Sequence, residues 1–305
     1  MTTVFVDDPM PDAERRQRIY SGDIFVFGPR PSTVALIGLA RRMLEEAFAP
    51  LNPVDAQYEM PVEEFVEIFG PVKPAFIHHP ETRQLIAAVL DEFGCDADDT
   101  YMDVPRYRGV TSDGYLTAGV GYAHHPHRDT WYSAPMCQLN WWTPVYEFAS
   151  ESSMAFIPRY FDESIENGSA EFNYYEWNKT GRASAAQHIR QDSRKQPKAL
   201  RPLEPGPEIR VVCPPGGIVL FAGAQMHATV PNTSGRSRFS LDFRTVNLPD
   251  LLSGDGAPNV DSHPTGTSLR DFVRVRDQAQ MPDDVVARYD VASADGDGVL
   301  VYRPA

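Results

Sequence analysis

The chain has few cysteines and no long apolar run, and both absences narrow the class of protein. Only three of its 305 residues are cysteines, and no two of them form a CxxC motif. An odd, widely spaced set argues against a disulfide framework or a zinc–thiolate site. The longest apolar runs fall far short of the ~20 residues that a bilayer-spanning helix needs. We therefore expect a protein of the reducing cytoplasm that does not enter a membrane.

The N-terminal stretch also lacks the features of an export signal. It reads "MTTVFVDDPMPDAERRQR", with neither a basic leading region nor an apolar core. Secretory signal peptides need both. We therefore expect no signal peptide, in agreement with the cysteine usage.

Positive charge is scarce. Lys and Arg number 28 against 42 Asp and Glu, so the formal net charge is −14. An acidic protein repels nucleic-acid phosphates, so we expect a small-molecule substrate and no nucleic-acid partner. Between Lys179 and Arg201, however, seven basic residues face the single acid Asp192. This segment is either a solvated loop or an electropositive wall that attracts an anionic small molecule.

No linker, charge run or internal repeat divides the chain, so we expect one domain over residues 1–305. Residues 1–99 form a mostly helical lead-in, because apolar residues recur at helical spacing. We expect a short strand in "DIFVF" and helices in "STVALIGLARRMLEEAF", "PVEEFVEIFG" and "ETRQLIAAVLDEFG". The first helix has Ser32 or Thr33 as its expected N-cap. The other two should end at Gly70 and Gly94.

From about residue 100 the sequence changes to short β-rich runs separated by Gly, Pro, Asn or Ser. The runs are "TYMDVPRYRG", "YLTAGVGYAHHPH", "MCQLNWWTPV", "SSMAFIPRYF", "EIRVVC", "GGIVLFAG", "HATVPN" and "SRFSLDFRTV". About eight such runs over 100–247 predict a mainly β fold with flanking helices, in which two antiparallel sheets form a jelly roll.

Two further segments are distinguished by composition. The polar interruption at 162–207 is too long for a hairpin, and its aromatic residues favour an ordered lid. These aromatic residues are Phe172, Tyr174, Tyr175 and Trp177. The C-terminal extension, 248–305, is expected to hold one helix near "SLRDFVRVRDQAQ" and a last strand, "GVLVYR".

The stretch "YAHHPHRDTWYS" carries three histidines and an aspartate within a dozen residues. His127 and Asp129 form an H-x-D motif. On a strand, residues i and i+2 project to the same face, so both side chains can point at one ion while Arg128 points away. Imidazole and carboxylate suit iron(II), and a third ligand would still leave open coordination positions. A lone H-x-D occurs often by chance, so the motif needs a third ligand elsewhere.

Three later histidines are candidates for that ligand: His188, His227 and His263. His188 lies in the polar interruption and His263 in the Gly/Pro-rich tail. His227 follows the tight turn and buried strand of "PPGGIVLFAGAQM" and begins the next strand. Because a rigid strand holds a ligand firmly, His227 is the favoured residue; a satisfied core histidine is the alternative.

A carboxylate clamp is expected beside His227. Arg238 follows eleven residues later, and Ser240 two residues further on. A strand–turn–strand unit of this length returns Arg238 alongside His227, and an arginine fork with a hydroxyl binds a carboxylate well. Thr229 shares the face of His227 and could add a second hydroxyl. Arg236 competes for the role of Arg238 but lies nearer the turn.

Together, His127-x-Asp129, His227 and Arg238-x-Ser240 resemble the iron(II)- and 2-oxoglutarate-dependent oxygenases, which have a double-stranded β-helix (cupin-like) fold. The phrase "PPGGIVLFAGAQMHATVPNTSGRSRFS" is most similar to their phytanoyl-CoA dioxygenase-like branch, and the likeness covers roughly 100–247. The resemblance implies Fe(II), 2-oxoglutarate and O2 as cofactors and co-substrates. It implies His127, Asp129 and His227 as iron ligands. It further implies that Arg238, helped by Ser240 or Thr229, binds the distal carboxylate of 2-oxoglutarate.

The resemblance also implies a reaction class. Related halogenases replace the metal-binding aspartate with a small residue, whereas Asp129 is present here. Hydroxylation of an unactivated C–H bond, or desaturation or ring formation, is therefore expected on a small metabolite that the basic segment allows to be anionic. The expected substrate contacts are His125, Trp131, Asn140 and Trp142, with Gln138 as the alternative on the Asn140 strand. His124 is expected to point away from the site.

Two other readings fit the same motifs. A cupin-type metal-dependent dioxygenase or isomerase would use no 2-oxoglutarate, and His124 and His125 are compatible with its more histidine-rich sites. A non-catalytic jelly-roll binding module would hold no stoichiometric ferrous iron and release no succinate. Loss of activity in an Arg238→Ala variant distinguishes the oxygenase from the cupin-type enzyme.

Overall fold

The computed structural model describes residues 2–121, 124–181 and 196–290. Several features of the sequence lie outside these described residues: His188, Arg182, Arg190, Asp192, Arg194, Lys195 and the expected strand "GVLVYR". The strands are β1 (Val4–Val6), β2 (Ile24–Phe27), β3 (Thr100–Met102), β4 (Arg106–Val110), β5 (Leu139–Pro144), β6 (Met154–Phe156), β7 (Ile209–Arg210), β8 (Ile218–Ala222), β9 (His227–Thr229), β10 (Arg238–Asn247) and β11 (Val273–Arg274). The α-helices are α1 (Asp12–Tyr20), α2 (Pro31–Phe48), α3 (Val62–Ile77), α4 (Pro80–Glu92), α5 (Tyr174–Glu176), α6 (Leu248–Ser253) and α7 (Asp283–Tyr289).

Within the described residues the strands form two sheets. The larger sheet has the order β1-β2-β8-β5-β10-β3-β11, with β4 also pairing to β10, and the smaller has the order β7-β6-β9. All strand pairs in the two sheets are antiparallel except β1 with β2. The larger sheet includes β2 from the helical lead-in and β11 from the C-terminal extension. Both segments are therefore part of the same sheet as β5, β8 and β10.

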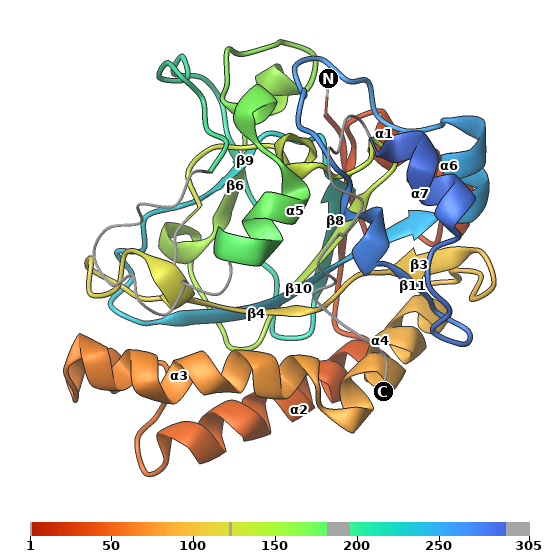
Figure 1. Cartoon of the computed structure of the whole chain (residues 1–305). Helices are drawn as coiled ribbons and strands as arrows, with labels where there is room; N and C mark the ends of the chain where they lie inside the picture. Colours follow the sequence, from red (N-terminus) through yellow and green to blue (C-terminus); the bar gives the residue numbers. More distant parts are fainter. Residues whose placement is uncertain (1, 122–123, 182–195, 291–305) are drawn as a thin grey trace.

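Helices α2, α3 and α4 form a layer on the outer face of the larger sheet (Figure 1). The ring of Phe69 on α3 lies 5.8 Å from that of Tyr107 on β4 and 5.3 Å from that of Phe239 on β10. Side chains alternate between the two faces of a strand, so Arg106 and Arg108 point away from this helical layer. The helices therefore cover the apolar face of the sheet and leave the opposite face for polar side chains.

The two sheets pack against each other through a second apolar cluster. Trp142 of β5, Val219 and Phe221 of β8 and Phe156 of β6 are buried in one cluster, in which the rings of Phe156 and Phe221 lie 4.8 Å apart. The expectation was a mainly β fold with flanking helices; the structure is a mixed fold of sheets and helices, which is compatible with the expected jelly-roll core. None of the helices in the described part of the chain has the length and apolar character that a bilayer-spanning segment requires.

Four segments differ from the sequence prediction. Helix α3 continues through Gly70, Pro71 and Pro74 to Ile77, because its apolar face stays packed on the sheet over the full length. The N-cap of α2 is Arg30 and not Ser32 or Thr33; Pro31 occupies the first turn, where a proline fits without losing a hydrogen bond.

The other differences lie in loops. The described residues of the run "YLTAGVGYAHHPH" form a 3-10 turn at Gly119–Gly121 and, at His127, an isolated bridge, and not a strand. The segment "SLRDFVRVRDQAQ" forms a 3-10 turn at Ser268–Asp271 and then β11, and not a helix. In the second segment the pairing of β11 with β3 replaces the expected helix, and local periodicity does not detect such pairing.

Candidate metal centre

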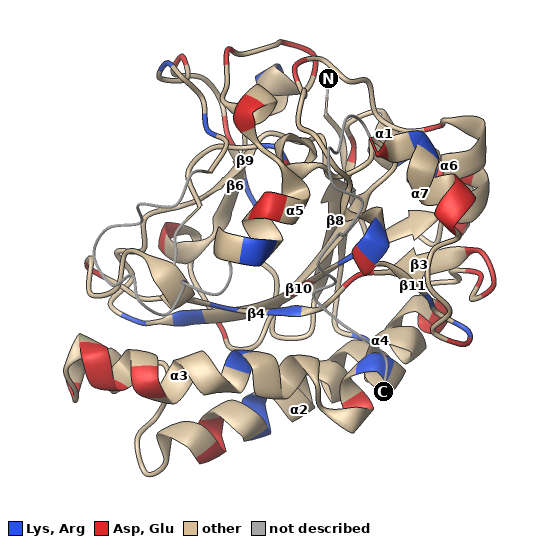
Figure 2. Ribbon diagram, in the orientation of Figure 1, with Lys and Arg blue, Asp and Glu red and all other residues tan. Residues whose placement is uncertain are grey.

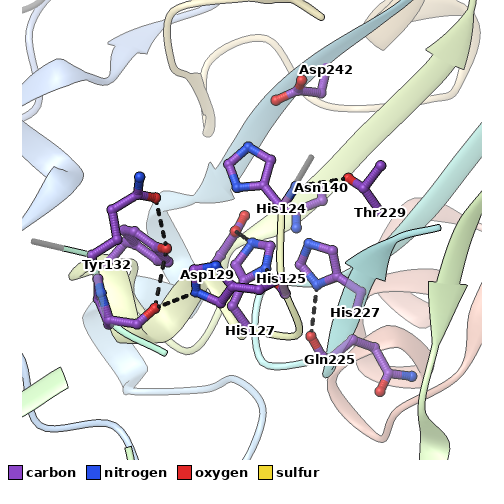
Figure 3. Close-up of polar contacts among 12 residues, drawn as sticks. His124, His125, His127, Asp129, Tyr132, Asn140, Gln225, His227, Thr229 and Asp242 are labelled. Atoms are coloured by element: carbon purple, nitrogen blue, oxygen red, sulfur yellow. Dashed lines mark hydrogen bonds and ion pairs between the residues drawn. The ribbon is translucent and has the colours of Figure 1, made fainter. Parts of the chain in front are cut away.

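The two sheets bring His127, Asp129 and His227 together. His127 and His227 pair as an isolated antiparallel bridge, with both N–H···O distances at 3.0 Å. Asp129 begins a 3-10 turn that runs from Asp129 to Tyr132. One ligand atom from each of the three lies within 4.8 Å of the others, and all three residues are buried (Figure 3). Among the described residues this is the group of histidine and acidic side chains arranged to hold a metal ion.

Both histidines present the nitrogen that a metal requires. Nδ1 of His127 lies 2.8 Å from the carbonyl of His125, and Nδ1 of His227 lies 2.9 Å from the carbonyl of Gln225. A carbonyl accepts only, so Nδ1 carries the proton in each ring and Nε2 keeps its lone pair. Burial lowers the pKa of His227 to about 4, so this ring is neutral at physiological pH.

Asp129 is held as a carboxylate. Arg244 Nε lies 3.3 Å from Oδ2, and Gln138 Nε2 donates to the same oxygen at 3.2 Å. Burial alone would raise the pKa of Asp129, but the charge of Arg244 and the contacts with His127 and His227 together outweigh it and hold this pKa well below its usual range. The other oxygen, Oδ1, lies 3.5 Å from His127 Nε2. One oxygen is thus braced by the protein, and the second faces the histidines.

His127 and Asp129 face the same point, but not in the way that the sequence predicted. His127 and Asp129 do not follow one another on a regular strand, since the chain turns at Asp129. Arg128 points away from the site as expected, and its side chain is only 1% exposed. It pairs with Asp261 at 3.0 Å and donates to the carbonyl of Ala224 at 2.7 Å. This buried arginine holds the loop from His127 to Tyr132, which we call the ligand loop, on the side away from the cavity.

The expected carboxylate clamp lies on β10. Arg238 and Ser240 are both buried and share one face of that strand. Arg238 donates through Nη1 to the carbonyl of Ser152 at 2.9 Å. Neither Arg238 Nε nor Ser240 Oγ has a hydrogen-bond partner among the described residues, although both atoms are buried. Burial lowers the pKa of Arg238 to about 10, so it stays charged at neutral pH, and no residue in the described ranges forms an ion pair with it.

His127, Asp129, His227 and Arg238 line one cavity of about 430 Å³, a size typical of small-molecule sites, whereas Ser240 is not among its lining residues. Asn140 and Trp142 of β5 line this cavity, and so does Gln138, which precedes the strand. The expected contacts Asn140 and Trp142 and their alternative, Gln138, therefore all face it. Thr229 of β9 also lines it, and its hydroxyl accepts from the backbone N–H of His124 at 3.2 Å.

The expected substrate contacts His125 and Trp131 do not line this cavity, whereas the adjacent residues His124 and Tyr132 do. His124 lines it, with its ring 5.1 Å from that of His127, whereas His125 bonds to the carbonyl of Pro197. Trp131 is fully buried and donates to Asp261 at 2.8 Å, while Tyr132 lines the cavity. Side-chain alternation was counted along a strand that does not exist at this point, so the sides expected for His124, His125 and Trp131 are wrong.

Sequence reasoning missed two charged residues of β10 that line the site. Asp242 and Arg244 follow Arg238 and Ser240 at alternate positions of β10 and line the same cavity. Arg108, opposite on β4, forms a two-point ion pair with Asp242 at 2.7 and 3.2 Å. The signal was available, because residues i+4 and i+6 of a strand must share the face of residue i.

Comparisons with known proteins identify similar solved structures but no family. No protein-family model matches the chain, and neither does any curated protein. EvdO2 from Micromonospora carbonacea var. aurantiaca, whose structure is also known with 2-oxoglutarate, is 13% identical, with 78% of this chain and 91% of that chain covered and a TM-score of 0.45.

Two further structures come from nogalamycin biosynthesis. The non-heme alpha-ketoglutarate-dependent epimerase SnoN is 14% identical over 87% of this chain and 100% of that chain, with a TM-score of 0.42. The non-heme alpha-ketoglutarate-dependent carbocyclase SnoK is 11% identical over 77% of this chain and 83% of that chain, with a TM-score of 0.37. At such identities and TM-scores the chemistry of this chain must be argued from its own side chains.

Proposed function

We propose that the chain is an iron(II)- and 2-oxoglutarate-dependent oxygenase that acts on an unactivated C–H bond of a small metabolite. The observation that carries the proposal is the buried triad of His127, Asp129 and His227 in the same cavity as Arg238. Two neutral imidazoles and one carboxylate suit a non-heme iron(II) site with open positions. In this proposal residues 1–305 form a single oxygenase domain that is built around a double-stranded β-helix core.

The side chains fit both groups. For the metal, each histidine keeps an unprotonated Nε2 and Asp129 keeps one oxygen directed at the histidines. For 2-oxoglutarate, Arg238 Nε and Ser240 Oγ are buried donors without a partner among the described residues. An unsatisfied buried donor costs about 1–3 kcal/mol, so an anionic ligand that accepts from both would be stabilised there.

Iron(II) with 2-oxoglutarate and O2 would supply the oxidising power for C–H cleavage. The chain's own residues would bind, orient and exclude water. His127, Asp129 and His227 would hold the metal, and Arg238 with Ser240 would fix the distal carboxylate of 2-oxoglutarate. Gln138 and Arg244 would keep Asp129 ionised and oriented. Holding the reactants in one geometry lowers the entropic part of the barrier.

The test is succinate formation from 2-oxoglutarate by the purified protein with iron(II) and O2, across a panel of metabolites. We expect the parent protein to release succinate and Asp129→Ala to lose at least about 100-fold of that rate. Even groups that only support a metal ligand change affinity or activity by about 10–100-fold. His263→Ala is the matched control, because His263 is an exposed histidine of the C-terminal extension outside the cavity lining.

The outcomes separate the proposal from its rivals. Equal succinate release by Asp129→Ala and the parent would overturn the site assignment. Activity that survives Arg238→Ala and needs no 2-oxoglutarate would favour a cupin-type enzyme. Absence of stoichiometric metal binding and of succinate would favour a binding module.

A further inference from the structure

Beyond the triad, one side of the cavity is aromatic. Tyr132, Phe172 and Trp177 line it, and we call these three residues the aromatic wall. The wall begins at the metal site, since the ring of Tyr132 lies 5.6 Å from that of His127. It continues through Phe172 at 5.3 Å and then Trp177 at 6.1 Å. Trp177 opens a π-helical turn, a distortion often found at functional sites.

Another side of the cavity is charged and also begins at the triad. Arg244, paired with Asp129, contacts Asp103 through Nη1 at 3.1 Å and through its backbone N–H at 2.8 Å. Arg106 Nη1 contacts the same carboxylate at 2.6 Å and the carbonyl of Val104 at 3.0 Å. Two guanidinium groups therefore share Asp103. The basic segments of β4 are visible in Figure 2 on a chain that is otherwise acidic.

The remaining charges of the cavity are matched once the proposed cofactors are counted, and the inference rests on the proposed function at this step. Arg108 is neutralised by Asp242. A dication would be balanced by Asp129 and one carboxylate of 2-oxoglutarate, and Arg238 by the other. Among the described lining residues of the two sheets, only Arg106, Arg244 and Asp103 remain, with two positive charges against one negative.

Arg106 is the residue of this group that can bind a further anion. No described residue accepts from its Nε or Nη2, and its side chain is 20% exposed. Arg244 is less suited, because it already contacts both Asp103 and Asp129. Lys73 of α3 adds another positive charge to the cavity lining. A carboxylate or phosphate can take two parallel hydrogen bonds from such a fork.

We propose that the substrate is an organic anion, with its carboxylate or phosphate bound by Arg106 and an apolar ring or hydrocarbon body packed on the aromatic wall. The aromatic and the charged side both start at the metal ligands, at His127 and at Asp129 respectively. A molecule lying between them is thus held at the triad by two different kinds of contact. Apolar contact would supply affinity, and the guanidinium would select the charge and orient the molecule.

The test measures binding by calorimetry with Ni(II) and saturating 2-oxoglutarate, so that Arg238 is occupied and no turnover occurs. The probes are 2-naphthoate, 2-naphthyl phosphate and the neutral 2-naphthamide. We expect at least one anion to bind about tenfold or more tightly than the amide, as for a charged hydrogen bond. The stronger of the two anions identifies the group. Arg106→Gln should reduce the preference to within about twofold, whereas Arg106→Lys should keep most of it.

Phe172→Ala should weaken all three probes alike, and Arg210→Gln, an exposed arginine of β7, should change none. The inference is overturned if the amide binds as tightly as both anions, if Arg106→Gln keeps the preference, or if no probe binds at millimolar concentration. Failure of the parent protein to bind Ni(II) or 2-oxoglutarate would instead contradict the proposed function. The two failures are therefore distinguishable.

Discussion

At the residue scale, His127 and His227 each use one ring nitrogen to fix the ring and leave the other for a ligand. The backbone carbonyls of His125 and Gln225 accept from Nδ1 at 2.8 and 2.9 Å. In both cases the carbonyl belongs to the residue two positions earlier. The tautomer that a metal needs is therefore set locally, by the backbone of the same segment that carries the ligand.

Arg238 and Arg236 offer a matched pair for testing the 2-oxoglutarate clamp. Arg238 is buried in the cavity, whereas Arg236 is exposed and lies 3.5 Å from Asp55. We expect Arg238→Gln to weaken 2-oxoglutarate binding about 10- to 100-fold, because hydrogen bonds to charged groups contribute about 1.5–3 kcal/mol. Metal affinity should change little. Calorimetric titration of the Ni(II) protein measures both quantities.

Arg236→Gln should bind 2-oxoglutarate as the parent does. Equal weakening by the two variants would point to the general charge of the protein and not to a specific clamp. An unchanged affinity in Arg238→Gln would remove Arg238 from the site.

At the scale of elements, the ligand loop is held from behind by the C-terminal extension. Asp261 pairs with Arg128 at 3.0 Å and accepts from the Trp131 indole at 2.8 Å. It also accepts from the backbone N–H of Ile165, in the insertion, at 3.0 Å. One carboxylate thus connects the extension and the insertion to the loop between His127 and Tyr132.

Removing this carboxylate should be costly. Asp261→Ala leaves Arg128 charged and buried, and breaking a buried ion pair from one side costs about 3–5 kcal/mol. We expect a loss of that order in the free energy of unfolding, measured by urea titration, together with weaker metal binding. Glu208→Ala, which breaks the exposed pair with Arg210, should cost no more than about 1 kcal/mol. Similar values for the two variants would refute the bracing role.

The elements also explain which parts of the structure the sequence could predict. Strands such as β5, β8 and β10 carry apolar alternation or short β-branched runs, so their positions and the pairing of His227 with the H-x-D motif could be predicted. The ligand loop could not be predicted, because its path depends on the bridge between His127 and His227 and on the contact of Arg128 with Asp261. Both contacts join residues far apart in the sequence, so neither produces a local pattern of apolar and polar residues. For this reason the sides of His124, His125 and Trp131 were assigned wrongly.

At the scale of the whole molecule, charge is separated between surface and cavity. The chain carries a net charge of −14, yet the described residues that line the cavity include five Lys and Arg against three Asp. The imbalance arises because alternate residues of β4 and β10 place arginines on the inner face. Anions are thus favoured inside a protein that repels them outside, and low-dielectric walls strengthen this preference.

The three cysteines should be unreactive in the folded protein. Cys95, Cys137 and Cys213 are free, and burial raises the pKa of each thiol, to about 12 for Cys213. Since the thiolate is the reactive form, we expect less than one thiol per chain to react promptly with a disulfide reagent at mildly alkaline pH. All three should react in guanidinium chloride. Fast reaction of a thiol in the native protein would contradict this packing.

A crystal structure of the metal-loaded protein, with anomalous scattering to locate the ion, tests the central claim most directly. We predict one divalent ion, about 2.0–2.2 Å from Nε2 of His127, Nε2 of His227 and a carboxylate oxygen of Asp129, the usual range for such ligands. Arg238 should remain outside the coordination sphere. An ion bound elsewhere, or no ion between these three side chains at saturating metal, would contradict the account.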